Sequence, residues 1–353
     1  MLVTGGTGAL GALVARHLAS QGAKHLLLTS RRGAKAEGAK ELKAELKALG
    51  AKATITACDA SERDQLADLL NSITKAHPLG AVIHTAGVLD DGVIESLDDE
   101  RLDRVLAPKL DAAWHLHELT KGLDLQAFVL FSSVAATWGG PGQANYAAAN
   151  AFLDSLARHR RAQGLAAHSI AWGLWQKASG MTGELGEADL ARMARLGIAP
   201  LSDQQGLELF DQARTIDEPF LVAARLDTPA LRAQARSGML PALLRGLVRA
   251  PARRSQDTGQ LARQLAELPE AEREQAVLAL VRTHVAAVLG HASPEQVDPK
   301  RAFKELGFDS LGAVELRNRL SQATGLRLPS TLVFDYPSSV EVAGYLREQV
   351  EGK

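Results

Sequence analysis

Cysteine is almost absent from this chain, and so is any long apolar run. Cys58 is the only cysteine among 353 residues, which excludes a disulfide framework and a cluster of thiolate metal ligands. No apolar stretch approaches the roughly 20 residues that cross a bilayer. The N-terminal Met1-Leu2-Val3 enters a strand pattern at once and leaves no room for a signal peptide. These absences predict a cytoplasmic protein with no membrane partner and no metal site.

An excess of charge of one sign is also missing. The chain has 40 Lys and Arg residues against 41 Asp and Glu residues, and its formal net charge is −1. No overall field would therefore attract nucleic acid or a membrane surface. Apolar residues make up 46% and charged residues 23%, which is typical of globular proteins. The length predicts two or three domains.

Short apolar runs alternate with amphipathic stretches over the first two thirds of the chain. The runs predict strands at Met1–Thr4, Lys24–Ser30, Lys52–Cys58, Ala81–Thr85, Ala127–Ser132, Ala167–Trp172 and Pro219–Ala223. The stretches predict helices at Leu10–Gln21, Ala36–Leu49, Glu62–Lys75, Asp98–Leu119 and Tyr146–Gln163. This alternation predicts an α/β fold with a doubly wound, parallel, Rossmann-like sheet.

The alternation ends after Asp227 and gives way to a basic segment. Residues 235–259 are rich in Arg, Pro, Ala and Gly, and no aromatic residues are interspersed among the arginines. A solvated linker is therefore a better interpretation than a nucleic-acid surface. The predicted domains are 1–234, a linker at 235–261, and 262–353.

Helical periodicity returns from Leu261 onward. One apolar stripe consists of Val277, Leu280, Val281, Val285 and Val288. A second helix is expected from Asp309 to about Gly325, and Ser338-Ser339-Val340-Glu341 reads as a capping box that opens a last helix. The C-terminal domain is predicted to be a small, all-α four-helix bundle.

A glycine-rich loop follows the first predicted strand and opens the first predicted helix. Its glycines allow a close approach to a pyrophosphate, and the helix N-terminus offers free N–H groups. The second strand ends in Ser30-Arg31-Arg32, where arginine suits a 2′-phosphate and so predicts NADP(H). Surface arginines after a strand are the alternative interpretation. The predicted cofactor residues are Gly5, Thr7, Gly8, Leu10, Gly11, Ser30, Arg31, Asp59 (for the adenine), and Ala86 and Gly87 (for the nicotinamide ribose).

Three polar residues gather around the end of the fifth predicted strand. Ser133 ends that strand, Tyr146 follows thirteen residues later, and Asn150 shares a helix face with Tyr146. A tyrosine of lowered pKa can protonate a developing alkoxide, with a nearby lysine lowering the pKa, and a serine can polarise a ketone. Each residue also has a plain structural alternative, as a helix start, a strand-end turn or a surface amide.

The first 230 residues resemble the catalytic half of the ketoreductase domain of modular polyketide synthases, a branch of the short-chain dehydrogenases. The matching segments are TGGTGALG, SRRG, HTAGVLDDG, PKLDAAWHLHELT, LFSS, PGQANYAAANAFLD and AWGLW. The resemblance implies an active-site set of Lys109, Ser133, Tyr146 and Asn150. Ordinary short-chain dehydrogenases have a lysine four residues after the tyrosine. Here Asn150 takes that place and the lysine comes earlier in the chain, as in the polyketide branch.

Residues 262 to 350 resemble the acyl carrier protein of the same synthases. The segments FKELGFDSLGAVELRNRL and LPSTLVFDYPS carry this resemblance. It implies that Ser310 bears a 4′-phosphopantetheine arm, which a phosphopantetheinyl transferase attaches, and that the substrate is a bound acyl thioester. Other synthase domains are then the expected partners. A plain N-cap serine is the alternative interpretation of Ser310.

Two fingerprints of product configuration conflict. In this family Leu89-Asp90-Asp91 marks B-type ketoreductases, which give the D-3-hydroxyl, whereas a tryptophan at the place of Trp138 marks A-type enzymes. The three-residue element receives more weight, so a B-type enzyme is expected. A lid is expected over 174–196, with Trp175 and Met181 as substrate contacts or as plain packing residues.

Complete ketoreductases of this type also carry a structural half before the glycine loop, whereas this chain begins within the first catalytic strand. Either the chain is a fragment of a larger synthase or the missing half is on another chain, and an exposed sheet edge or apolar patch is the expected result. The leading interpretation is NADPH-dependent reduction of a carrier-bound 3-oxoacyl thioester. The alternative is a carrier and interaction module whose reductase half is inactive without its structural half. A fatty-acid-type reductase fused to a carrier fits the motifs less well.

Overall fold

The computed structural model describes residues 1–140, 142–176, 197–237, 240, 242–248, 265, 267–291, 293–308, 310–329 and 331–351. Within them the chain divides into two compact units, one ending at Leu231 and the other beginning at Arg232. Each unit has its own apolar core.

A seven-stranded parallel sheet forms the centre of the first unit. Its strands are β1 (Leu2–Thr4), β2 (His25–Ser30), β3 (Lys52–Ala57), β4 (Ala81–His84), β5 (Ala127–Ser133), β6 (His168–Trp172) and β8 (Phe220–Ala223). Their order is β3-β2-β1-β4-β5-β6-β8. After β1 the chain adds β2 and β3 on one side, and it then adds β4 and the later strands on the other side, as in a doubly wound fold. The seven predicted strands are therefore confirmed to within one residue at each end.

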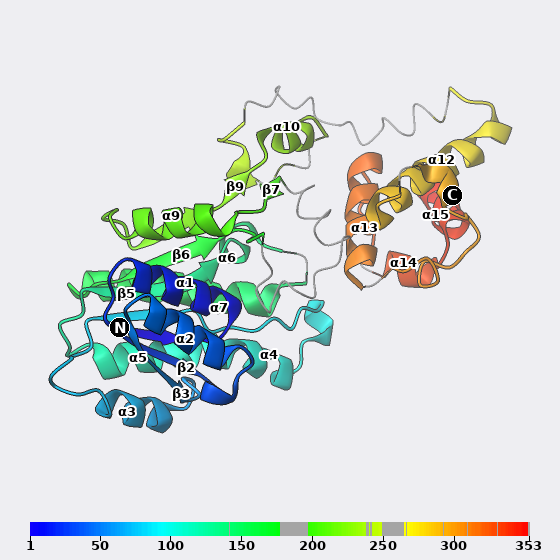
Figure 1. Ribbon diagram of the computed structural model, residues 1–353. Helices are drawn as coiled ribbons and strands as arrows, with labels where there is room; N and C mark the ends of the chain where they lie inside the picture. The colour runs from blue at the N-terminus through cyan, green and yellow to red at the C-terminus, as the bar shows by residue number, and fades with distance from the viewer. Residues whose placement is uncertain are drawn as a thin grey trace. The chain divides into compact units, whose positions relative to one another are not determined.

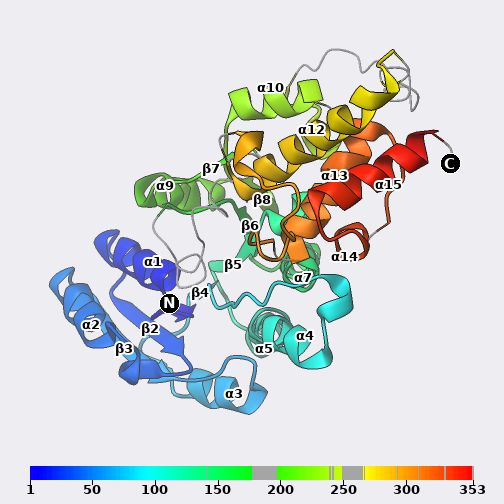
Figure 2. The same ribbon diagram turned by 90° about the vertical axis from the view of Figure 1, so that its right-hand side faces the viewer.

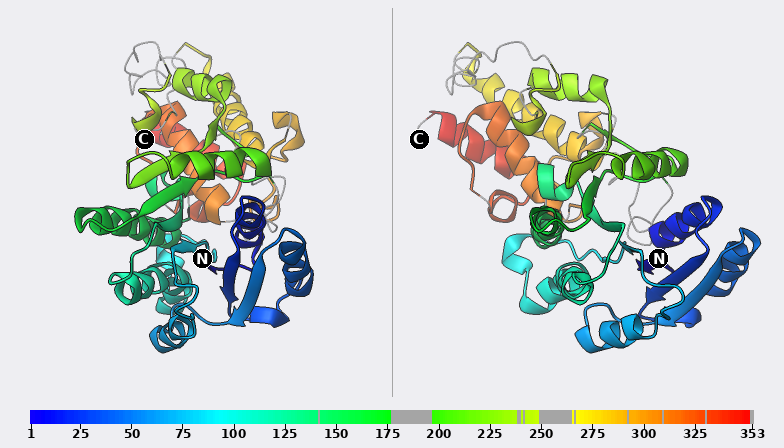
Figure 3. Two further views of the ribbon diagram at one scale, coloured as in Figure 1. Left: turned by 60° about the vertical axis from the view of Figure 1, so that its left-hand side comes forward. Right: turned by 90° about the vertical axis from the view of Figure 1, so that its left-hand side faces the viewer.

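Helices cover both faces of this sheet (Figure 1). On one face lie α1 (Ala9–Ser20), α2 (Ala39–Ala48) and α9 (Asp203–Ala213), which pack apolar side chains against one side of the strands. On the other face lie α3 (Arg63–Asn71), α5 (Ala112–Thr120) and α7 (Ala144–Ala162). Figure 2 and Figure 3 show the same layers from further directions. Strands buried on both faces explain why the apolar runs are continuous in the sequence.

The predicted helix over 98–119 is one helical run with an interruption. It consists of α4 (Asp99–Leu106), a π-helical turn η3 (Ala107–Asp111) and α5. The Asp98 side chain caps its start by accepting a hydrogen bond from the Arg101 N–H at 2.9 Å. A π-turn adds a residue to the helical repeat and often occurs at functional sites. Lys109 lies within this turn.

Helical structure extends into the start of the predicted linker. A helix, α10, spans Thr228–Ser237, and a short 3₁₀ turn, η4, spans Ala242–Leu244. The Asp227 carboxylate accepts a hydrogen bond from the Ala230 N–H at 3.0 Å, so Asp227 starts α10 as an N-cap. The proline at position 229, near the helix start, is a further signal that the compositional argument overlooked.

The remaining short elements of the first unit lie in its loops. They are η1 (Gly33–Lys35), η2 (Ile94–Ser96), α6 (Ala135–Trp138) and a two-stranded antiparallel pair, β7 (Ile198–Ala199) with β9 (Arg225–Leu226).

The second unit is helical. It contains α12 (Glu270–Leu289), η5 (Pro294–Gln296), α13 (Ser310–Thr324), α14 (Leu332–Asp335) and α15 (Ser339–Glu351). Its core includes Val277, Val281 and Val285 of the predicted stripe, while Leu280 lies outside the core. Ser338 caps α15: its hydroxyl accepts from the Glu341 N–H and donates to the Glu341 carboxylate. None of the helices over the described residues is long and apolar enough to cross a membrane.

Candidate active site

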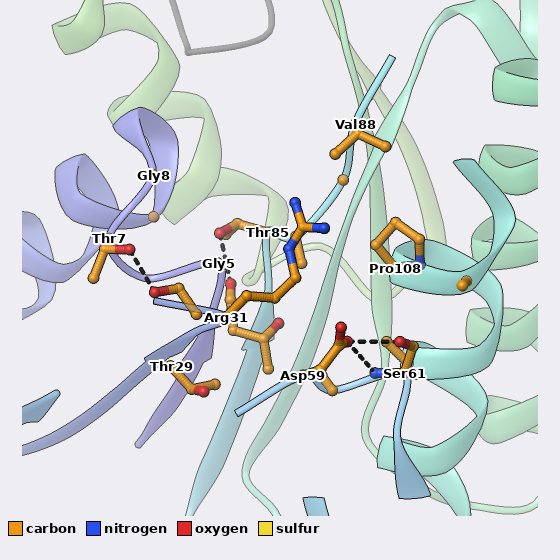
Figure 4. A pocket seen from close by; sticks show the side chains of 18 of the residues that line it. Gly5, Thr7, Gly8, Thr29, Arg31, Asp59, Ser61, Thr85, Val88 and Pro108 are labelled. Atoms are coloured by element: carbon orange, nitrogen blue, oxygen red, sulfur yellow. Dashed lines mark hydrogen bonds between the residues drawn. The ribbon is translucent and has the colours of Figure 1, made fainter. Parts of the chain in front are cut away.

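A cavity of about 930 Å³ opens at the carboxyl ends of β1 to β4. This is the edge at which parallel α/β sheets bind ligands. All ten predicted cofactor residues line the cavity: Gly5, Thr7, Gly8, Leu10, Gly11, Ser30, Arg31, Asp59, Ala86 and Gly87. Figure 4 shows residues from the glycine loop and from three further strand ends around it. The fold therefore brings together positions that are more than 80 residues apart in the sequence.

The glycine loop is built so closely that side chains would not fit in it. Gly5 has a left-handed φ of 68°, and a Cβ there would lie 2.8 Å from the Ala86 nitrogen. A Cβ on Gly11 would lie 2.3 Å from the Gly5 carbonyl oxygen. The Gly8 N–H donates to that same oxygen at 2.9 Å. The result is a tight turn that leads into the N-terminus of α1, as a pyrophosphate site requires.

Hydroxyl and charged groups also line the cavity, at the ends of β2 and β3. Thr7 Oγ1 donates to Ser30 Oγ at 2.8 Å, and Ser30 Oγ accepts from the Gly33 N–H at 3.1 Å. The Arg31 side chain extends into the cavity between the glycine loop and Pro108 (Figure 4). Asp59 Oδ1 accepts from the Ser61 N–H and the Ser61 hydroxyl, which orients its carboxylate at the end of β3. With Arg32 and Arg104, which also line the cavity, this region offers cationic and polar groups to a ligand.

The four predicted catalytic side chains lie close together, and Lys109 joins them to the cavity, because a Cβ on the lining residue Gly87 would lie 2.8 Å from Lys109 Cε. Ser133 ends β5, Tyr146 and Asn150 lie on α7, and Lys109 lies in the π-turn. Lys109 is only 2% exposed, although an exposed helix lysine is the simplest expectation for that position in isolation. Its Nζ donates to the Phe131 carbonyl at 2.9 Å and lies 5.5 Å from the centre of the Tyr146 ring.

The protonation of the site is set mainly by burial. Burial lowers the pKa of Lys109 to about 8, and the Asp154 carboxylate partly offsets this. Burial raises the pKa of the Tyr146 hydroxyl; the neighbouring Ser133 and Asn150 side chains lower it, and the charge of Asp91 raises it. The expected lowering of the Tyr146 pKa is therefore not observed, because burial outweighs the favourable neighbours.

Asn150 has one amide oxygen ready to accept a hydrogen bond. Its Nδ2 donates to the Tyr146 carbonyl at 2.7 Å, and its backbone carbonyl accepts from Ser132 Oγ at 3.3 Å. The residue is fully buried, and its Oδ1 has no hydrogen-bond partner within the described residues. A buried, unpaired acceptor is costly, so this oxygen is suited to a donor that arrives with ligand or water.

Two further buried groups near Lys109 were not predicted from the sequence. Asp154 follows Asn150 by four residues on the same face of α7, and its carboxylate accepts from Ser169 Oγ at 2.6 Å. His84, at the end of β4, is fully buried and its Nδ1 lies 2.7 Å from Thr4 Oγ1. Burial, followed by the charge of Lys109, lowers the pKa of His84 to about 3, so it is neutral. The i, i+4, i+8 spacing of Tyr146, Asn150 and Asp154 was the available signal for Asp154.

The residues predicted to control stereochemistry have different surroundings. Leu89 lines the cavity. The Asp90 carboxylate pairs with Arg101 at 2.7 Å and with Arg104 at 2.9 Å. The Asp91 carboxylate accepts from Gln143 Nε2 at 2.9 Å, three residues before Tyr146. Trp138 ends α6 and is partly exposed. The charge of Asp91 contributes to the raised pKa of Tyr146.

The remaining predicted residues are only partly described. Ser310 is the first residue of α13 in the second unit, whereas Asp309 lies outside the described residues. Most of the expected lid, including Met181, also lies outside them. Trp175 is 4% exposed and packs in the core, with its ring 5.0 Å from that of Trp172. Trp175 is therefore a packing residue here.

Comparison with protein families assigns both units. Residues 1–177 match the KR domain model, and residues 279–346 match the model of the phosphopantetheine attachment site. The first match covers the cavity and all four catalytic candidates. The second match includes Ser310.

Similar proteins and structures agree with these matches. The chain is 58% identical over 362 residues to polyketide synthase GfsB of Streptomyces halstedii, a match that covers 100% of this chain and 6% of that protein. Solved structures include an A1-type ketoreductase, at 48% identity and a TM-score of 0.64, covering 69% of this chain and 50% of that one. A-type ketoreductases from a modular polyketide synthase match at 50% identity and a TM-score of 0.61, covering 66% and 48%.

Proposed function

This chain belongs to the KR-domain family of ketoreductases and carries a phosphopantetheine attachment site, and we propose that it reduces a carrier-bound 3-oxoacyl thioester to the 3-hydroxyacyl thioester in polyketide biosynthesis. The observation that carries this proposal is the meeting of Lys109, Ser133, Tyr146 and Asn150 beside the glycine-loop cavity. The chain spans 6% of the length of GfsB, so the activity of a complete synthase belongs to the proposal as well.

NADPH is the proposed cofactor. The tight glycine loop suits a pyrophosphate, and the Arg31 side chain in the cavity suits a 2′-phosphate. Asp59, Ala86 and Gly87 line the same cavity. The proposed role of Asp59 is to bind the adenine, and that of Ala86 and Gly87 is to contact the nicotinamide ribose. When bound there, the reduced nicotinamide supplies the hydride that the ketone carbon receives.

The side chains of this chain supply the proton and the polarisation. Tyr146 donates its phenolic proton to the oxygen of the ketone as negative charge develops there. Ser133 donates a hydrogen bond to the same oxygen and so orients the carbonyl. The Tyr146 hydroxyl is protonated at neutral pH and able to donate, because burial raises a pKa that is ordinarily already about 10.

Lys109 and Asn150 support the transfer of that proton. Protonated Lys109, 5.5 Å from the centre of the Tyr146 ring, stabilises the phenolate that is left after the proton has moved. The unpaired Oδ1 of Asn150 accepts a hydrogen bond from a water or a ligand hydroxyl next to Tyr146, which returns a proton to the site.

Ser310 is the proposed attachment site of the 4′-phosphopantetheine arm. It lies within the residues that match the phosphopantetheine attachment model and begins α13. A phosphopantetheinyl transferase would load it, and other synthase domains would deliver the acyl group. We propose 1–234 as the reductase domain, 235–261 as a connecting segment that includes the end of α10, and 262–353 as the carrier domain.

We further propose the D-3-hydroxy (B-type) product. The Asp91 carboxylate, bound to Gln143 and acting on Tyr146, supports this outcome. The A-type structures, which are 50% and 48% identical to this chain over the matched parts, and Trp138 favour the L-3-hydroxy product instead. The geometry of Asp91 at the site is the reason for preferring the B-type product.

The direct test is reduction of a β-ketoacyl pantetheine thioester by the purified chain with NADPH. We expect loss of nicotinamide absorbance and a D-3-hydroxy product on a chiral column. Tyr146→Phe, which lacks the hydroxyl that donates, should lower kcat by about 10²-fold or more. Unchanged activity in this variant would contradict the assignment of Tyr146 as the proton donor.

A second measurement tests the carrier separately. Incubation with a phosphopantetheinyl transferase and coenzyme A should add one phosphopantetheine mass to the chain, and Ser310→Ala should abolish the addition. An unchanged mass in the parent chain would contradict the carrier assignment. If phosphopantetheine is added but no ketone is reduced, the result would contradict only the proposed reductase activity and not the carrier assignment.

A further inference from the structure

One arginine holds the loop that bears the predicted stereocontrol residues. Arg101 lies in the first turn of α4, and its guanidinium contacts the loop over 89–96 at several points. Its Nε donates to Asp90 Oδ1 at 2.8 Å, and its Nη1 donates to the carbonyl and hydroxyl oxygens of Ser96 at 3.0 and 3.2 Å. Its Nη2 donates to the carbonyls of Asp90 and Asp91. The loop is therefore folded around a single side chain.

The loop backbone packs closely against this guanidinium. A Cβ on Gly92 would lie 2.7 Å from Arg101 Nη1 and 2.8 Å from Ser96 Oγ, so the backbone at Gly92 lies directly against the guanidinium. A planar fork of five N–H donors can satisfy these acceptors together, whereas the single ammonium of a lysine cannot. The hydrogen bonds to the Asp90 and Asp91 carbonyls and the ion pair with the Asp90 carboxylate therefore form together only with an arginine.

The other side of the same loop is attached to the segment before the catalytic helix. The Gly92 N–H donates to the Gly142 carbonyl at 2.8 Å, and Gln143 donates to the Asp91 carboxylate at 2.9 Å. Asn145, which is buried, donates from Nδ2 to the Asp90 carbonyl at 2.9 Å. Tyr146 is the next residue along the chain. The loop is therefore clamped between Arg101 and the start of α7.

We propose that Arg101 is a positioning residue that holds the Asp91 carboxylate against Gln143, three residues before Tyr146, and thereby determines which face of the ketone is reduced. It does not touch the reacting atoms; it acts through the backbone of Asp90 and Asp91. Arg104 pairs with the carboxylates of Asp90, at 2.9 Å, and Glu100, at 2.8 Å. It therefore binds a side chain of the loop and does not substitute for Arg101 at the two carbonyls. The proposal rests on the proposed ketoreduction, and the first measurement below does not require that activity.

Amide hydrogen exchange of the peptide over 88–97 tests the positioning itself. Arg101→Gln should raise the exchange rate at Gly92 and its neighbours by on the order of tenfold, because the loop loses its inner clamp. Arg16→Gln is the matched control, since Arg16 also pairs with an acid, Glu45 at 2.7 Å, far from this loop in sequence. Unchanged protection in Arg101→Gln would overturn the proposal, whether or not the chain reduces ketones.

The ratio of D- to L-3-hydroxy product tests the consequence. Arg101→Gln should lower that ratio by on the order of tenfold while it retains turnover, and Arg101→Lys should also lower it. In an Asp91→Ala background the same Arg101→Gln change should leave the ratio where Asp91→Ala has put it. A ratio equal to that of the parent chain in Arg101→Gln, or an equal effect of that change without Asp91, would overturn the proposal. If exchange is faster in Arg101→Gln but the parent chain does not reduce ketones, the result would contradict the proposed function and not the positioning by Arg101.

Discussion

Lys109 has chemistry that depends closely on its surroundings. It carries its charge in a buried position, where its Nζ donates to one backbone carbonyl. Burial lowers its pKa to about 8, and Asp154 opposes the lowering. At neutral pH the lysine is still mainly protonated, and the Asp154 carboxylate contributes to this. The pH range of catalysis should therefore depend on a residue that does not contact the substrate.

Asp154→Asn should narrow the active pH range from the alkaline side. Without the carboxylate the pKa of Lys109 falls further, so the decline of kcat/KM that accompanies deprotonation should begin on the order of one pH unit lower. A profile of kcat/KM from pH 6 to pH 10 measures this. Ser169→Ala removes a hydrogen bond to the same carboxylate but retains its charge, and should leave the decline near pH 8. An alkaline limb that does not move in Asp154→Asn would show that Asp154 does not tune Lys109.

At the scale of elements, α9 is positioned by a glycine. Gly206 lies in the first turns of α9 against the ring of Trp175, and a Cβ there would lie 2.1 Å from that ring. Trp175 in turn packs with Trp172 at the end of β6. The glycine therefore allows the helix to approach the sheet closely, and its poor helix propensity is offset by this contact.

Gly206→Ala should destabilise the first unit, although alanine favours helix. Overpacking of this kind costs about 1–3 kcal/mol, more than the ~1 kcal/mol gained in propensity. Urea unfolding followed by circular dichroism measures the change. Gly344→Ala in α15 is the control, because no heavy atom lies within 4 Å of the new Cβ, and it should stabilise the second unit by about 0.5–1 kcal/mol. An equally stable Gly206→Ala variant would mean that Trp175 can move aside at little cost.

At the scale of the whole molecule, stability is divided between separate cores. Two apolar clusters lie on opposite faces of the sheet in the first unit. A third cluster lies within the helices of the second unit and shares no residue with the other two. Each unit can therefore lose its core while the other remains folded.

A matched pair of Leu→Ala substitutions should show this independence. Leu130 in β5 and Leu316 in α13 are both fully buried, so each substitution should cost about 2–5 kcal/mol. In scanning calorimetry Leu130→Ala should lower the midpoint of one transition, and Leu316→Ala should lower that of the other. A single transition that both substitutions shift equally would contradict separate cores.

Local patterns were sufficient for most of the architecture. The strands were predicted to within a residue because buried parallel strands are continuous apolar runs. The π-turn at Lys109 was not predicted, because it differs from an α-helix by one residue in the hydrogen-bond repeat and leaves the apolar pattern nearly unchanged. The composition after Asp227 does not predict the helix α10, whose signal in the sequence is the N-cap at Asp227.

The sequence by itself determined the sheet, the glycine loop and the identity of the residues that line the cavity. These features depend on side-chain periodicity and on motifs that are contiguous in the chain. Only the tertiary structure decided the burial of Lys109, the raised pKa of Tyr146, and the contacts of Asp154 and Arg101. Burial and electrostatics depend on every neighbour in space, and those neighbours come from β5, β6, α4 and α7, which are far apart in the sequence.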